Sequence, residues 1–178
     1  FISGTGSNLK NLINFSKTKK SPISIDLIIS NTIKAKGLKY SNQYKIKKKI
    51  LNLKNIRIAE KRLLNLLKQN KIQFICLAGF MKILSSKFIK QFNGKIINIH
   101  PSLLPRYKGL NTHSRAIQNK DKFTGCSVHY VTEKLDSGKI IIQKKIKILK
   151  KDTPKSLAKK VLKQEHKLYP KAILKIFN

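Results

Sequence analysis

The sequence predicts one α/β domain: a mostly parallel sheet with helices on both faces and an antiparallel pair of strands near the C-terminus. Three observations lead to this prediction. Apolar runs of strand length alternate with stretches of helical period, which is typical of a parallel sheet with covering helices. The last two strand-like runs are separated only by a short turn region at 136–138, so they should pair antiparallel. The length of 178 residues suits one compact domain, which we expect to span 1–178.

The predicted strands are short apolar runs, and the predicted helices lie between them. Strands are expected from the beginning of the chain to Ser3 and at 23–30, 46–51, 74–78, 95–99, 126–132 and 139–148. Helices are expected at 8–15, 58–68, 86–92 and 111–119, and the second of these has an apolar stripe of Leu63, Leu66 and Leu67. Because the chain opens on Phe1 rather than Met, inside a strand-like run, we expect further residues to precede it.

A last helix should begin with Thr153 as its N-cap and Pro154 at its first position, where the missing N–H costs nothing. Leu157, Val161 and Leu168 should then face the core, and Pro170 should kink or interrupt the helix.

The net charge of +33 is the most unusual property of the composition. The excess is almost entirely lysine, since arginine occurs only at 57, 62, 106 and 115. Arginine is preferred for recognising phosphates and bases, so we interpret the charge as a solvated surface, with a dedicated RNA site as the alternative. No apolar run is long enough for a membrane span, and Cys76 and Cys126 lack zinc-site spacing. A cytoplasmic protein with small-molecule substrates, no specific nucleic acid and no membrane partner is expected.

The segment Gly4-Thr5-Gly6-Ser7-Asn8 follows the first strand and opens the first helix. Glycines let backbone N–H groups approach an anion, and a helix N-terminus adds a favourable dipole, so the segment suits a phosphate. It lacks the Gly-Lys-Ser/Thr of a P-loop and the third glycine of the dinucleotide fingerprint. A tight turn capped by Ser7 explains the pattern equally well.

The string Asn98-Ile99-His100-Pro101 ends a buried strand, and the period of two puts Asn98 and His100 on one face. In parallel sheets, ligands bind at the carboxyl ends of the strands. An Asn amide can stabilise an oxyanion and a His can exchange protons near neutral pH, so the pair indicates a catalytic site. Asp136 would orient His100 if its loop folds back over the sheet, and otherwise reads as a turn residue.

Five motifs occur in order along the chain: ISGTGSNL at 2–9, LAGFMKIL at 77–84, NIHPSLLP at 98–105, SVH at 127–129 with LDSG at 135–138, and QEH at 164–166. Together they resemble the glycinamide ribonucleotide formyltransferases, folate-dependent enzymes of purine synthesis. The resemblance runs from Phe1 almost to Asn178. It implies a Rossmann-like N-terminal half and transfer of a formyl group from 10-formyltetrahydrofolate, a co-substrate, to the amine of glycinamide ribonucleotide, without a metal.

The resemblance also implies roles for individual residues. The catalytic trio would be Asn98, His100 and Asp136. The ribonucleotide phosphate would bind at Gly6, Ser7 and Asn8, while Pro101 and Glu165 would contact the rest of that substrate. A folate pocket would lie between the segment Phe80 to Leu84 and the loop 131–136, with these contributing residues: Arg57, Phe80, Met81, Lys82, Ile83, Leu84 and Val131.

Two residues depart from the family pattern. Asn111 stands where the family commonly has a second His, and Lys82 stands where it often has Arg. Neither belongs to the trio. The alternatives within the same chemistry are a methionyl-tRNA formyltransferase and a formyltetrahydrofolate hydrolase, which usually carry a further RNA-binding or regulatory domain. The alternative from another class is a catalytically silent basic fold that binds RNA.

Overall fold

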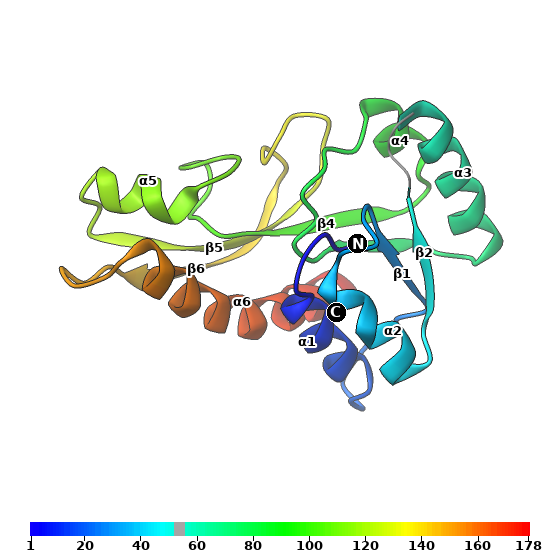
Figure 1. The fold of residues 1–178 in the computed structure, drawn as a ribbon, viewed down its shortest axis with the longest axis horizontal. Coiled ribbons are helices and arrows are strands. Elements are labelled where there is room, and N and C mark those ends of the chain that lie inside the picture. Colours follow the sequence, from blue (N-terminus) through cyan, green and yellow to red (C-terminus); the bar gives the residue numbers. More distant parts are fainter. Residues whose placement is uncertain (52–55) are drawn as a thin grey trace. The chain divides into compact units, whose positions relative to one another are not determined.

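The computed structural model describes residues 1–51 and 56–178 of the chain (Figure 1). Contacts divide the chain into two compact units, Phe1–Ile97 and Asn98–Asn178, and strand β4 (Lys95–His100) crosses from one to the other. Parallel strands combined with helices confirm the predicted α/β class. The prediction of a single domain over 1–178 stays a prediction. In the part of the chain that the structure describes, no helix is both long and apolar enough to cross a membrane.

The first unit contains a parallel pair of strands, β1 (Leu27–Ser30) and β2 (Lys47–Ile50), with Leu27 opposite Lys47. The predicted strand at 23–30 is too long at its start. Ser21 Oγ donates to the carbonyl oxygen of Ile23 at 3.0 Å and Ser24 Oγ donates to Asp26 at 2.9 Å. Such local bonds compete with strand pairing. The predicted first strand is likewise reduced to one parallel bridge, between Ile2 and Ser30.

Three helices of the first unit confirm predictions to within two residues, namely α1 (Ser7–Ser16), α3 (Ile56–Gln69) and α4 (Ser86–Gln91). In α3, Leu63 and Leu67 are buried as expected, whereas Leu66 is only half-buried. Strand β3 (Phe74–Leu77) follows α3 and is hydrogen-bonded to β4.

Two elements were not predicted from the sequence: a short 3-10 helix, η1 (Lys36–Leu38), and the helix that follows it, α2 (Lys39–Tyr44). The sequence of α2, KYSNQY, has no apolar stripe, so hydrophobic period does not reveal it. The helix is fixed by burial of Tyr40 and by the Ser41 hydroxyl, which donates to the carbonyl oxygen of Ile46 at 2.7 Å. Packing therefore decides this element.

In the second unit, β5 (Phe123–Tyr130) pairs antiparallel with β6 (Ile140–Lys147), which confirms the predicted strand pair. Strand β5 is also hydrogen-bonded to β4. The pairing of β5 with β6 shifts between Val128 and His129, which is a β-bulge. The short helix α5 (Thr112–Gln118) precedes β5, and α6 (Pro154–Phe177) packs against β5, β6 and α5.

Helix α6 begins as predicted, because the Thr153 hydroxyl accepts a hydrogen bond from the backbone N–H of Ser156 at 3.1 Å and Pro154 is the first helical residue. Leu157, Val161 and Leu168 are buried, as expected.

A kink or an interruption was predicted at Pro170, and the interruption is wrong, since α6 continues through Pro170 to Phe177. A proline inside a helix costs about 3 kcal/mol. Its neighbours Leu168, Tyr169 and Ile173 are buried, and each such side chain contributes about 1.5–3 kcal/mol. Burial of this face outweighs the cost of the proline.

Candidate active site

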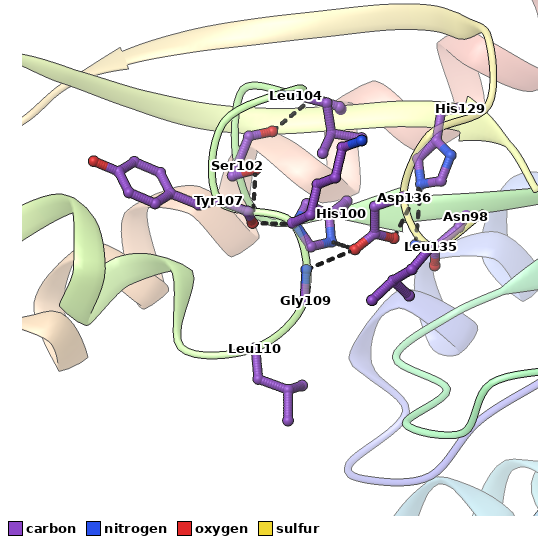
Figure 2. Close-up of polar contacts among 12 residues, drawn as sticks. Asn98, His100, Ser102, Leu104, Tyr107, Gly109, Leu110, His129, Leu135 and Asp136 are labelled. Carbon is purple, nitrogen blue, oxygen red and sulfur yellow. Dashed lines mark hydrogen bonds and ion pairs between the residues drawn. The ribbon is translucent and has the colours of Figure 1, made fainter.

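The end of β4 presents two polar side chains, Asn98 and His100, to a shared cluster that Figure 2 shows. Buried isoleucines, including Ile97 and Ile99, fix the strand, and the alternation of side chains then puts Asn98 and His100 on the other face. His100 is buried, with 5% of its surface exposed. A buried polar group needs hydrogen-bond partners, and the surrounding loops of the second unit supply them.

Asp136 comes to this cluster from the loop between β5 and β6. Gly138 closes the loop so tightly that an added Cβ would lie 1.8 Å from the carbonyl oxygen of Tyr130, so only glycine fits. Asp136 itself has a left-handed backbone, with φ 45°. Its Oδ2 accepts a hydrogen bond from the backbone N–H of Gly109 at 2.8 Å. The loop therefore does fold back to His100, and Asp136 is more than a turn residue.

His100 faces an acceptor on each ring nitrogen (Figure 2). Its Nε2 lies 2.8 Å from the carbonyl oxygen of Tyr107, and its Nδ1 lies 3.4 Å from Oδ2 of Asp136. A neutral imidazole has one N–H and can donate to one of these acceptors, whereas an imidazolium can donate to both. The surroundings are thus suited to a positively charged His100 beside the Asp136 carboxylate.

His129 on β5 completes the cluster, although the sequence analysis did not select it. Its Nδ1 lies 2.8 Å from the carbonyl oxygen of Tyr130, which can only accept, so Nδ1 carries a proton. Its Nε2 lies 3.3 Å from Nδ2 of Asn98 and 3.6 Å from Oδ1 of Asp136. A neutral His129 therefore accepts one N–H of the Asn98 amide and leaves the second N–H for another acceptor.

Burial lowers the pKa of His129, and the nearby His100 lowers it further, while the Tyr130 carbonyl and Asp136 act in the opposite direction. The neutral form is thus the stable one. The register of β5 against β6 shifts beside this side chain, and β-bulges are frequent next to active sites. The sequence did contain a signal that could have selected His129, because this residue lies two positions after Ser127, near the end of a strand-like run.

A set of serine hydrogen bonds holds the backbone that follows His100. Ser127 Oγ donates to the carbonyl oxygen of Ser102 at 2.6 Å and accepts from the backbone N–H of Leu104 at 3.0 Å. Ser102 Oγ donates to the carbonyl oxygen of Arg106 at 2.6 Å. These hydrogen bonds hold the chain between His100 and Tyr107, whose carbonyl oxygen faces the imidazole of His100.

The glycine segment Gly4 to Asn8 lies in the first unit, at the start of α1. Gly6, not Ser7, is the N-cap, so the proposed capping by Ser7 is wrong. Gly6 has φ 75°, a left-handed conformation that residues with a side chain rarely adopt. A Cβ added to Gly6 would lie 2.6 Å from Cα of Gly37. Ser7 and Asn8 are then residues of the first turn of α1.

The formyl transferase family matches residues 1–173 of the chain. The chain belongs to this family. Among curated relatives, phosphoribosylglycinamide formyltransferase of Haemophilus influenzae is 39% identical over 175 residues, which cover 97% of this chain and 82% of the relative. The human trifunctional purine biosynthetic protein adenosine-3 is 41% identical over 175 residues, but the chain spans only 17% of that protein's length.

Solved structures of family members agree with the fold. The phosphoribosylglycinamide formyltransferase of Brucella melitensis has a TM-score of 0.93 and 41% identity, covering 99% of this chain and 92% of that one. The enzyme of the same name from Bacillus halodurans has a TM-score of 0.95 and 33% identity, covering 100% of this chain and 93% of that one.

The residues that the family resemblance assigns to folate lie mainly in the first unit. Met81 and Ile83 are 64% and 66% exposed, so core packing does not explain them, whereas Leu84 is buried. Phe80 is half-buried and packs edge-on against Phe1, with ring centroids 5.5 Å apart. Arg57, in the first turn of α3, and Lys82 are exposed. Val131 lies in the second unit, directly after β5, and is half-buried.

The remaining family positions lie in the second unit. Pro101 follows His100 and is half-buried, and Glu165 is buried in α6. Burial raises the pKa of the Cys126 thiol to about 12, with a further contribution from Glu165 against an opposing one from Lys144. Cys126 is therefore a protonated core thiol rather than a nucleophile. Within 1–51 and 56–178, no group of three or more His, Cys, Asp or Glu side chains is arranged to hold a metal ion.

Proposed function

We propose that this chain transfers the formyl group of 10-formyltetrahydrofolate to the amine of glycinamide ribonucleotide, giving formylglycinamide ribonucleotide and tetrahydrofolate in cytoplasmic purine biosynthesis. The observation that carries the proposal is the buried cluster in which Asp136 faces His100 and in which His129 orients Asn98. Family membership and the names of the relatives support the reaction class and the acceptor.

In this reaction the substrate amine attacks the formyl carbon, a new C–N bond forms, and the bond to the folate nitrogen breaks. Negative charge develops on the formyl oxygen in between. Two donors of the cluster suit that oxygen: the second N–H of the Asn98 amide and the Nδ1–H of a protonated His100, which it would share with Asp136 because Nε2–H donates to the Tyr107 carbonyl. Removing one such donor typically costs about 3–4 kcal/mol of transition-state stabilisation.

Asp136 has two tasks in this proposal. Its carboxylate stabilises the imidazolium of His100 and holds the ring in place. It also helps a proton to move from the attacking amine to the departing folate nitrogen, directly or through water. The hydrogen bond from Gly109 and the contacts with two histidines fix the carboxylate for both tasks.

Substrate binding is proposed from the family positions. The first-turn N–H groups at Ser7 and Asn8, behind the close turn at Gly6, would bind the ribonucleotide phosphate. Pro101 and Glu165 would contact the rest of that substrate. The exposed apolar side chains of Met81 and Ile83 would contact the folate, together with Phe80, Lys82, Leu84, Arg57 and Val131. A co-substrate folate needs apolar surface with a few cations, and these residues offer both.

The test is an acceptor comparison with purified protein. We would incubate it with 10-formyltetrahydrofolate, follow release of tetrahydrofolate, and supply glycinamide ribonucleotide, methionyl-tRNA or water alone as acceptor, with His100→Ala as the control. We expect turnover with glycinamide ribonucleotide only. Turnover with methionyl-tRNA or water would identify one of the related enzymes instead.

A catalytically silent RNA-binding fold would show no turnover with any acceptor. It would also retain RNA at physiological salt, whereas a lysine-rich surface without a dedicated site binds RNA weakly and loses it steeply as salt rises.

A further inference from the structure

The segment 107–111 supplies the candidate site with two main-chain groups that no side-chain motif reveals (Figure 2). The carbonyl oxygen of Tyr107 faces Nε2 of His100 at 2.8 Å, and the backbone N–H of Gly109 donates to Oδ2 of Asp136 at 2.8 Å. Both members of the His100–Asp136 pair thus depend on where this short segment lies.

The backbone of this segment is unfavourable in isolation. Tyr107 has φ 55° and Asn111 has φ 57°, so two non-glycine residues within five positions are left-handed. Such conformations persist only where the surroundings hold them. The segment therefore needs anchors outside itself.

Arg115, an exposed residue of α5, is such an anchor. Its NH1 donates to the carbonyl oxygen of Lys108 at 2.7 Å and lies 3.4 Å from that of Leu110. Its guanidinium also lies over the Tyr107 ring, 5.1 Å from the centroid. One guanidinium thus contacts the residues on both sides of Gly109 and the residue that faces His100.

We propose that Arg115 is a positioning residue, which holds segment 107–111 so that Gly109 donates to Asp136 and Tyr107 accepts from His100. Arginine suits the role because its planar group can donate to a carbonyl while stacking on a ring, and it stays charged at every working pH. The catalytic consequence rests on the proposed function, but the hydrogen bond of Gly109 can be measured without it.

The first measurement is amide hydrogen exchange of Gly109 in the unliganded protein. In Arg115→Gln we expect this amide to exchange at least about 10-fold faster, because an amide that loses its acceptor loses protection. Amides of β5 and β6 should keep their wild-type rates, which shows that the variant is folded. An unchanged rate at Gly109 would overturn the proposal, whether or not the protein formylates anything.

Arg106 provides a matched control. Its guanidinium also lies over the Tyr107 ring, at 5.2 Å, but it donates to Asp121 at 2.9 Å and to the Tyr107 hydroxyl at 3.3 Å. Arg106→Gln removes one charge and one ring contact and should leave Gly109 exchange unchanged. If it accelerates exchange as much as Arg115→Gln does, ring stacking rather than the carbonyl contacts holds the segment, and the proposal is wrong.

The second measurement is steady-state kinetics of the same variants. Arg115→Gln should lower kcat by about 10- to 100-fold, as misplacement of reacting groups does. Its KM for both substrates should stay within about 3-fold, because a purely positional loss acts in the transition state. Arg115→Lys, which can still reach one carbonyl, should recover part of kcat. A rise in KM with unchanged kcat would assign Arg115 to substrate binding instead.

Discussion

His100 and His129 lie on neighbouring strands, are both buried, and face the two oxygens of the same carboxylate, at 3.4 and 3.6 Å. Their other contacts differ. His100 meets a carbonyl oxygen on its second nitrogen, so both of its nitrogens face acceptors. His129 meets a carbonyl oxygen on one nitrogen and the amide donor of Asn98 near the other.

The partners of an imidazole, and not its position beside Asp136, therefore set its role. His100 is suited to carry a positive charge and to donate to a developing oxyanion. His129 is suited to stay neutral and to fix the orientation of Asn98. The two roles can be tested separately, because removing a partner of His100 and removing a partner of His129 should affect activity differently.

The largest expected effects come from the His100 side of the comparison. His100→Ala and Asp136→Asn should each lower kcat by at least about 100-fold, since both groups act in the transition state. Asn suits position 136 because it tolerates the left-handed backbone there. Thermal melting would confirm that both variants fold, and turnover near the wild-type value in either would remove that residue from the trio.

A smaller effect is expected on the His129 side. His129→Leu removes the acceptor for the Asn98 amide, and we expect kcat to fall by about 10-fold because the donor remains but is no longer held in place. His129→Gln keeps a side-chain acceptor and should lose less. The measurement is kcat for both variants at saturating substrates. A loss in His129→Leu as large as that in His100→Ala would mean that His129 itself acts on the substrate.

The comparison also predicts how stability depends on pH. The pKa of folded His129 is lowered from its ordinary value of 6.5, chiefly by burial. Below that pH an unfolded chain binds more protons at this position than the folded chain, so the free energy of unfolding should fall as pH drops through about 6.5.

His113 and His166 are shifted in the same direction, so they add to the trend. His129→Gln should weaken but not abolish the dependence. Denaturant midpoints at several pH values between about 5.5 and 7.5 would measure it. A dependence identical to that of the wild type would show that His129 is not held neutral.

The smallest effect is expected at Cys126, a buried thiol on the same strand as His129. Because burial raises its pKa to about 12, it should resist alkylation in the folded protein and react only after unfolding. Cys126→Ala should retain most of the activity. Rapid labelling of Cys126 with parallel loss of turnover would contradict the non-covalent mechanism. Mass spectrometry of labelled peptides distinguishes Cys126 from Cys76.

Much of the fold could be predicted from the sequence, because β5, β6, α1 and α3 have clear period and turn signals. The failures share one physical origin. Helix α2 forms without an apolar stripe, and α6 continues through Pro170. In both places, burial in the folded protein outweighs the local preference of the sequence. Strand β1 begins later than predicted for a different reason, since local serine hydrogen bonds occupy the residues before it.

For the site, the period of two at Asn98 and His100 was sufficient to select them as a pair. Asp136 depended on the family resemblance, because the residues alone favoured a plain turn Asp. The carbonyl of Tyr107 and the N–H of Gly109 could not be predicted, since a main-chain group has no sequence signature of its own. The acceptor role of His129 could not be predicted either, because it depends on the tautomer that the Tyr130 carbonyl selects.

The most direct test of this account is a double-mutant cycle at His100 and Asp136, read as kcat/KM for glycinamide ribonucleotide. The two groups lie 3.4 Å apart, and the proposed function gives them one shared task, the support of a charged imidazole beside the transition state. Groups that act as a unit have strongly non-additive effects. We expect His100→Ala combined with Asp136→Asn to lose about as much activity as the worse single variant, whereas losses that multiply would show that the two residues act independently and would contradict the account.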